Sequence, residues 1–72
     1  MTTLDDLLAT VGVPRDGADD TELALGSLEV VSLVLSFEEA FGLTLRASEI
    51  RRDSFATRAA LRALLRAKGV AC

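Results

Sequence analysis

The stretch from residue 26 to residue 41, GSLEVVSLVLSFEEAF, is apolar on two opposite sides when it is drawn as an α-helix. At about 100° per residue, one broad side carries the residues that we expect to face a core: Val30, Leu33, Val34, Phe37, Ala40 and Phe41. Nearly opposite lies a second apolar stripe, Leu28, Val31 and Leu35, with glutamates beside it. A helix with two apolar faces is either buried on both or presents one face to a partner. A fully buried helix rarely carries three glutamates (Glu29, Glu38 and Glu39) so close to an apolar stripe, and we therefore expect the stripe to bind a partner.

The size of the chain predicts a single domain, residues 1–72. A domain this small buries only about 60 % of the surface that its unfolded chain exposes. Half of the residues are hydrophobic, and the only aromatic residues are three phenylalanines, which suits a small bundle packed by Leu, Val and Ala. No segment has the alternation of a strand. We expect an all-α fold with three main helices and one short helical turn.

The charge is unevenly distributed along the chain. Residues 1–41 hold nine acidic residues and one basic residue, whereas residues 42–72 hold two acidic and seven basic residues, for a net charge of −3. An acidic front half argues against nucleic acid as the main partner and favours proteins with basic docking patches.

Several classes of function find no support in the composition. The chain has no histidine, no paired-cysteine motif and no glycine-rich phosphate loop, so we expect no metal site and no stand-alone catalysis. The single cysteine, Cys72, cannot form an internal disulfide, and no apolar run or signal sequence opens the chain. We expect a cytoplasmic protein that does not enter a membrane.

A first helix is predicted over residues 4–11, because Thr3 and Asp6 form a capping signature and leucines then repeat at helical spacing until Gly12. A long loop follows over residues 12–25, and we expect Leu23 and Leu25 to anchor its end to the core. The acidic residues of this loop do not have the spacing of a calcium loop, which favours a solvated acidic segment. They are Asp16, Asp19, Asp20 and Glu22.

The main helix is predicted to begin at Ser27 and to end before Gly42. A single turn over residues 47–51 is expected to carry Ile50 inward. Thr57 is expected to cap a last helix that Gly69 closes. The core-facing residues of that helix would be Leu61, Leu64 and Leu65, with Phe55 beneath its first turn. Its basic residues, Arg58, Arg62 and Arg66, are expected to form a solvated face; an RNA- or membrane-binding helix is the alternative.

Ser27 has two interpretations. As the first polar residue of the helix, it is most simply an N-cap whose hydroxyl accepts a backbone hydrogen bond. A helix N-terminus also stabilises negative charge, so a phosphodiester attached to this hydroxyl would be in favourable surroundings. An enzyme that docked on the apolar stripe would have Ser27 within reach.

The pattern resembles the acyl and peptidyl carrier proteins, in which the serine of a Leu-Gly-x-Asp-Ser-Leu motif opens the second of four helices. The segment LALGSL, residues 23–28, matches this motif at both leucines and at the serine. Leu33 with FEEAFG, residues 37–42, resembles the Leu-Glu-Glu-x-Phe-Gly pattern, and SFAT, residues 54–57, resembles the entry to the last helix. The resemblance extends from Leu4 to Leu65. The chain differs from the family pattern at three positions: Gly26 replaces the aspartate, Ala24 replaces the glycine, and Arg58 takes a usually apolar place.

The resemblance implies that Ser27 carries 4′-phosphopantetheine, derived from coenzyme A, whose thiol holds acyl groups as thioesters. It implies a carrier that performs no catalysis itself. The Met1 start favours a discrete, monomeric protein, and the departures from the family pattern favour polyketide or other specialised-metabolite biosynthesis. The implied partners are a phosphopantetheinyl transferase, an acyltransferase or ligase, and ketosynthase-type enzymes. The residues implied to bind them are Leu28, Val31, Leu35, Glu38 and Glu39.

Two alternatives remain open at the level of the sequence. One is a carrier of aminoacyl or peptidyl groups with the same mechanism. The other is an interaction module that has the carrier fold without the cofactor, in which Ser27 is only a cap; Gly26 favours this interpretation.

Overall fold

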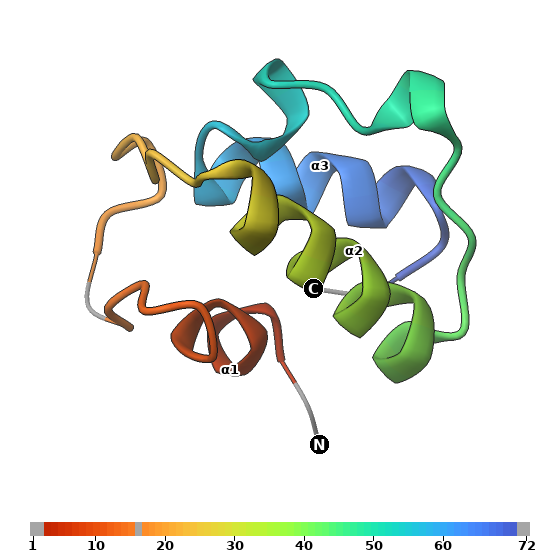
Figure 1. Cartoon of the computed structure of the whole chain (residues 1–72), viewed down its shortest axis with the longest axis horizontal. Helices are drawn as coiled ribbons and strands as arrows, with labels where there is room; N and C mark the ends of the chain where they lie inside the picture. Colours follow the sequence, from red (N-terminus) through yellow and green to blue (C-terminus); the bar gives the residue numbers. More distant parts are fainter. Residues whose placement is uncertain (1–2, 16, 71–72) are drawn as a thin grey trace.

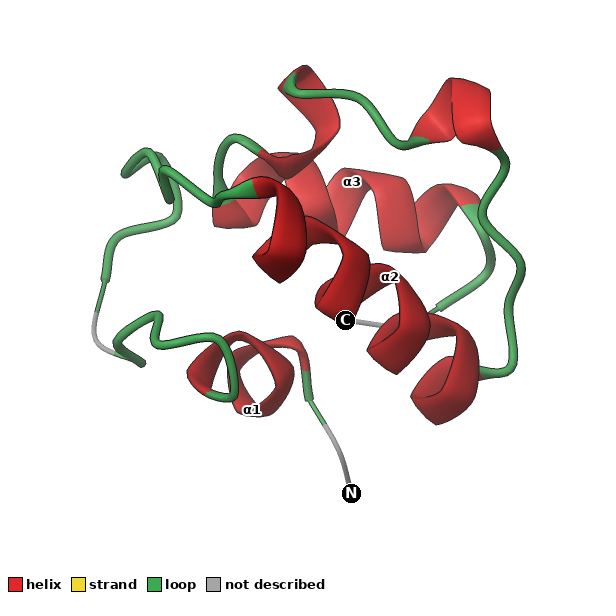
Figure 2. Cartoon of the chain, viewed as in Figure 1, coloured by secondary structure: helices red, strands yellow, loops and turns green. Residues whose placement is uncertain are grey.

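The computed structural model describes residues 3–15 and 17–70. These residues form three α-helices, α1 (Leu4–Ala9), α2 (Ser27–Phe41) and α3 (Arg58–Ala67), and two 3-10 turns, η1 (Ala47–Glu49) and η2 (Asp53–Phe55). Within this part of the chain there is no strand (Figures 1 and 2). An isolated antiparallel bridge joins Glu22 to Thr57. The predicted all-α class is confirmed. The predictions made for Asp16 and Cys72 concern residues outside the described ranges.

Helix α1 begins where the capping signature predicts and ends earlier than expected. The Thr3 hydroxyl accepts a hydrogen bond from the Asp6 N–H, and the Asp6 carboxylate accepts one from the Thr3 N–H. The predicted end at Val11 is wrong, since the helix stops at Ala9. The N–H groups of Thr10 and Val11 bond three residues back instead of four, which tightens the chain into a turn.

Helix α2 has the predicted bounds. Gly42 ends it in the left-handed conformation, with φ of 64°, which a glycine adopts without strain. Leu33 and Phe37 are fully buried, whereas the prediction that Ala40 faces the core is wrong. Ala40 lines a surface cleft with Leu7, Ser36 and Glu39, so this position of α2 is open to solvent and not covered by α1.

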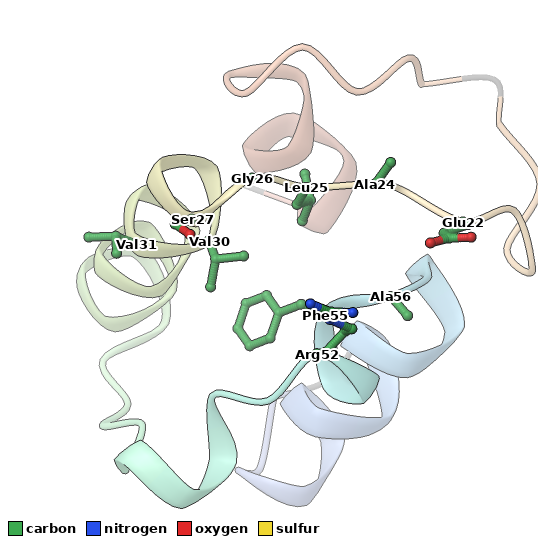
Figure 3. A pocket seen from close by; sticks show the side chains of 10 residues that line it. All are labelled: Glu22, Ala24, Leu25, Gly26, Ser27, Val30, Val31, Arg52, Phe55 and Ala56. Carbon is green, nitrogen blue, oxygen red and sulfur yellow. The ribbon is translucent and has the colours of Figure 1, made fainter.

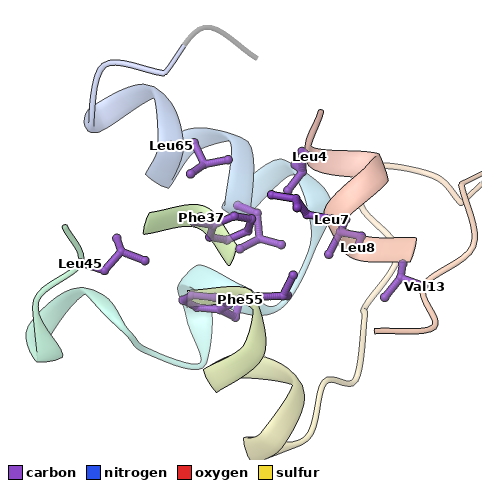
Figure 4. Packing of buried hydrophobic residues seen from close by; sticks show 10 residues of the cluster. Leu4, Leu7, Leu8, Val13, Phe37, Leu45, Phe55 and Leu65 are labelled. Atoms are coloured by element: carbon purple, nitrogen blue, oxygen red, sulfur yellow. The ribbon is translucent and has the colours of Figure 1, made fainter. Parts of the chain in front are cut away.

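The core lies where the inner faces of the three helices meet (Figure 4). The ring of Phe37 stacks against those of Phe41 and Phe55, with centroid distances of 6.1 and 6.4 Å. The loop residues Leu23 and Leu25 are half-buried and pack against this core, as predicted. The buried residues are Leu4, Leu7, Leu8, Val13, Leu33, Phe37, Leu45, Phe55, Leu61 and Leu65.

The connection from α2 to α3 contains two short turns where one was predicted. In η1, the Glu49 carboxylate accepts a hydrogen bond from the Arg46 N–H and also pairs with the Lys68 ammonium at 2.6 Å. This ion pair joins η1 to the end of α3. The turn η2 then leads into α3, which Thr57 caps by accepting from the Ala60 N–H, as predicted.

The prediction of a solvated basic face on α3 is wrong for Arg58. Its side chain is only 2 % exposed, and its Nε donates to Asp5 Oδ1 at 3.1 Å. A second guanidinium nitrogen donates to the Pro14 carbonyl. The loop after α1 therefore covers the first turn of α3, an arrangement that the four-residue spacing of the arginines cannot reveal.

Opposite charges from the two halves of the chain form ion pairs with each other. Besides the contact of Arg58 with Asp5, Arg62 pairs with Asp19. The Asp19 carbonyl also accepts from the Ala59 N–H at 3.0 Å. Part of the acidic character of the front half is thus neutralised internally.

Candidate functional site

Ser27 is the first residue of α2 and its side chain is exposed. The prediction that Ser27 caps this helix is wrong. Gly26 occupies the N-cap position, with φ of −80° and ψ of 172°, and its carbonyl accepts the first intrahelical bond from the Val30 N–H at 3.0 Å. Because Ser27 already has helical geometry, its hydroxyl makes no hydrogen bond to any residue that the structure describes, and it is available for chemistry.

The segment that leads into Ser27 is held against the entry to α3. The Leu23 N–H donates to the Ala56 carbonyl at 2.8 Å, and Leu25 packs on the core. Between them, Ala24 has φ of +52°, in the left-handed region that favours glycine. The chain thus reaches Ser27 along a fixed path that includes one strained residue.

A cleft of about 530 Å³ opens beside Ser27 (Figure 3). One wall is the first part of α2, the opposite wall is η2 and the residue after it, and residues 22–26 close a third side. The lining is apolar at Val30, Val31 and Phe55, and its charged members are Arg52 and Glu22. The cleft can therefore hold an apolar segment next to a charged group.

The apolar stripe of α2 is exposed, as its separation from the core face predicts. Leu28 is 80 % exposed, Val31 55 % and Leu35 60 %. These three are the large apolar side chains most open to solvent in the described part of the chain. Val31 also lines the cleft, so the stripe and the cleft form one continuous surface that adjoins Ser27.

The three glutamates near the stripe lie in different environments. Glu39 is exposed, whereas Glu29 and Glu38 are half-buried. The Glu38 carboxylate accepts a hydrogen bond from the Leu45 N–H at 3.1 Å and so holds the link after α2 in place. Glu38 therefore has a structural role that the sequence did not indicate, and Glu39 is the more accessible charge.

Two carboxyl groups remote from the cleft have lowered pKa values. Hydrogen bonds from the Thr3 N–H and from Arg15 lower the pKa of Asp6. The Lys68 ammonium and the Arg46 N–H lower the pKa of Glu49. Both shifts follow from the capping and ion-pair contacts that stabilise α1 and η1, and neither group lines the cleft at Ser27.

Arg52 and Phe55 are site residues that the sequence did not single out as such. Arg52 immediately precedes η2 and Phe55 ends it, and the position of this turn beside α2 depends on tertiary packing. In residues 3–15 and 17–70, no group of three acidic or cysteine side chains is placed to hold a metal ion. None of the helices in these ranges has the length and apolarity needed to cross a membrane.

Comparisons with protein-family models, with curated proteins and with solved structures found no match for this chain. Ser27, the residues around it and the surface that adjoins it are therefore the features from which a function can be inferred.

Proposed function

We propose that this protein is an acyl carrier protein, in which Ser27 bears 4′-phosphopantetheine and a partner enzyme docks on the outer face of α2. One observation carries the proposal. The unbonded, exposed hydroxyl of Ser27 stands at the start of a 15-residue helix whose exposed apolar stripe begins at the next residue.

The residues at this position suit a phosphodiester. Esterification needs a hydroxyl that a transferase can reach, and Ser27 is exposed and makes no side-chain cap bond. The first N–H groups of a helix lack intrahelical partners and point towards the N-terminus, where they stabilise an attached anion. The adjoining cleft, with Val30 and Phe55 in its lining, gives the first part of an attached arm an apolar surface to follow.

The terminal thiol of 4′-phosphopantetheine would supply the thioester linkage to the acyl group. The protein itself would supply a rigid attachment point and a docking surface, which raise the effective concentration of the acyl group at the partner's active site. In this proposal, η1 and η2 take the place of the short helix of a four-helix carrier bundle. The protein acts as a cytoplasmic monomer in polyketide or other specialised-metabolite biosynthesis.

The docking surface consists of Leu28, Val31 and Leu35, with Glu39 at its rim and Glu38 beside it. The partners would be a phosphopantetheinyl transferase, an acyltransferase or ligase, and ketosynthase-type enzymes. Exposed ion pairs contribute only about 0.2 to 1 kcal/mol each, so the apolar stripe should dominate a weak, transient contact. Val31→Glu should abolish transfer to a partner enzyme, and an unchanged circular dichroism spectrum would show that the fold is intact.

The test of the proposal is the intact mass of the protein after incubation with coenzyme A and a broad-specificity phosphopantetheinyl transferase. We expect a gain of one phosphopantetheine per chain and no gain for Ser27→Ala. This variant is a clean control because Ser27 makes no cap bond, so its stability should change by no more than about 0.5 kcal/mol.

A second candidate is an interaction module without a cofactor. The observation that favours it is Gly26, where the carrier motif has aspartate. In that case the folded protein would gain no mass, and the stripe would bind one partner permanently. A carrier of aminoacyl or peptidyl groups would give the same mass gain as an acyl carrier, and loading with each class of substrate would separate these two.

A further inference from the structure

Among the described residues, Arg52 is the only cation that lines the cleft at Ser27. It precedes η2, on the wall opposite α2, and Figure 3 shows its guanidinium beside Phe55 within the cleft. The remaining lining is apolar or small, apart from the Ser27 hydroxyl and Glu22. The cleft thus places one positive group across from the hydroxyl that we propose is modified.

The environment of Arg52 differs from that of most other cations of the chain. Arg15, Arg58, Arg62 and Lys68 each form an ion pair with an acidic residue. Arg52 is exposed and has no ion pair or side-chain hydrogen bond with any residue that the structure describes. Glu22, the acid that shares the cleft, is not within ion-pair distance of it. An unpaired guanidinium at the wall of a cleft is available to an anionic ligand.

The geometry points to Arg52 as a positioning residue that binds the phosphate of the group carried on Ser27. This inference rests on the proposed function, since the phosphodiester is the anion that modification would add to the cleft. A guanidinium matches phosphate oxygens well, because its planar array of donors can form two parallel hydrogen bonds. The contact would direct the root of the arm across the cleft, towards η2 and away from the apolar stripe.

The phosphate is favoured over a carboxylate on the acyl group by its place in the molecule. The phosphate is bonded directly to the Ser27 oxygen and therefore stays at the edge of the cleft. An acyl group is attached at the far end of a flexible arm, so a carboxylate on it has no fixed position relative to Arg52. Proximity makes the phosphate the stronger ligand.

The experiment compares wild type, Arg52→Gln and Arg51→Gln, each before and after loading with coenzyme A and the transferase. Arg51 is a matched control because it is an adjacent exposed arginine that does not line the cleft. Phosphorus NMR of the loaded proteins and the change in melting temperature on loading are measured at low and high salt. Melting of the unmodified variants shows that they are folded.

We expect loading to raise the melting temperature of wild type and of Arg51→Gln by about 2 to 4 °C more than that of Arg52→Gln at low salt. High salt should remove this difference, because salt screens exposed charges. The phosphorus resonance of wild type should move with salt, whereas that of Arg52→Gln should not.

Each contrary result has a distinct meaning. A folded wild type that gains no mass overturns both the carrier proposal and the inference. If all three proteins load and behave alike, only the role of Arg52 is overturned. A failure of Arg52→Gln alone to load would assign Arg52 to transferase docking. This last result would overturn the phosphate contact.

Discussion

The N-termini of α2 and α3 use their polar groups in opposite ways. At the start of α3, Thr57 caps the helix, Arg58 is buried against Asp5, and the loop before α2 bonds to the backbone of residues 56 and 59. At the start of α2, Gly26 provides no side-chain cap and the Ser27 hydroxyl is unbonded within the described residues. The polar groups at the start of α3 are bonded within the protein, whereas those at the start of α2 are available to a ligand.

The two faces of α2 make the same contrast within one element. Leu33 is fully buried, whereas Leu35, two residues later, is 60 % exposed. Both are leucines in the same helix, so a comparison of the two measures how much burial in the core contributes to the stability of the fold. An inner face that stabilises the fold and an outer face that does not is the arrangement expected of a docking helix.

The largest expected change in stability comes from substitutions that compare the inner and outer faces of α2. Leu33→Ala should lower the free energy of unfolding by about 2 to 5 kcal/mol, because it leaves a cavity in the core. Leu35→Ala should change it by no more than about 0.5 kcal/mol. Urea denaturation of both variants measures the difference. Similar losses for the two would mean that the outer face is also buried, for example in an oligomer.

A somewhat smaller effect is expected at the start of α3. Arg58→Ala should lower the free energy of unfolding by about 2 to 3 kcal/mol, because the buried guanidinium contacts both Asp5 and the Pro14 carbonyl. The loss should be below that of a fully buried ion pair, since Asp5 is partly exposed. Arg51→Ala, at an exposed position, is the control. If the two substitutions had equal effects in urea denaturation, Arg58 would not connect the loop to α3.

A gain in stability is expected from Ala24→Gly. An L-residue in the left-handed region is strained by about 1 to 2 kcal/mol, and glycine avoids that strain but loses about 0.5 to 1 kcal/mol through its greater freedom when unfolded. The net result should be a stabilisation of about 0.5 to 1 kcal/mol. Ala63→Gly, at an exposed position inside α3, should instead destabilise by about 1 kcal/mol. Thermal melting shows whether each substitution raises or lowers the stability of the protein. A loss of stability for Ala24→Gly as well as for Ala63→Gly would contradict the strain at Ala24.

The regular parts of this fold could be predicted because their signals are local. The periodicity of α2, the glycine at residue 42 and the caps at Thr3 and Thr57 each act within a few residues of the chain. The exposed stripe followed from the same periodicity. Sequence spacing could not reveal the burial of Arg58, because the covering segment lies more than 40 residues away in the chain. The cleft was missed for the same reason, since Arg52 and Ser27 become neighbours only through packing.

The sequence correctly predicts that α2 begins at Ser27, but the interpretation of Ser27 as the N-cap is wrong. Glycine is an acceptable N-cap residue, and here Gly26 adopts the extended cap geometry one residue before the serine. Local propensity ranks serine above glycine at this position, so the sequence alone favoured Ser27 as the cap. The shift by one residue is what frees the hydroxyl.

The smallest effect should come from a cap added to α2 at Gly26. The backbone there has φ of −80°, which any residue adopts, so Asn or Asp can supply a side-chain acceptor for the first turn. A Cβ at this position would lie 3.1 Å from a Glu29 carboxylate oxygen, so the Glu29 side chain must move. Gly26→Asn should therefore stabilise the protein by a few tenths of a kcal/mol, about 0.3, and Gly26→Asp by less, because its charge adds repulsion from Glu29.

Thermal melting of the two variants at low and high salt measures the net effect of that charge, and a larger gain for Asp than for Asn at low salt would show that the attraction of the helix N-terminus outweighs the repulsion from Glu29. The resemblance to carrier proteins implies a separate kinetic result, because the family's aspartate helps the transferase to recognise the serine. Gly26→Asp should be loaded faster than wild type, whereas Gly26→Asn should not. A faster rate for Asp alone would connect a carboxylate at residue 26, and not the cap bond that Asn also supplies, to modification. Equal rates for all three would leave residue 26 with a purely structural role.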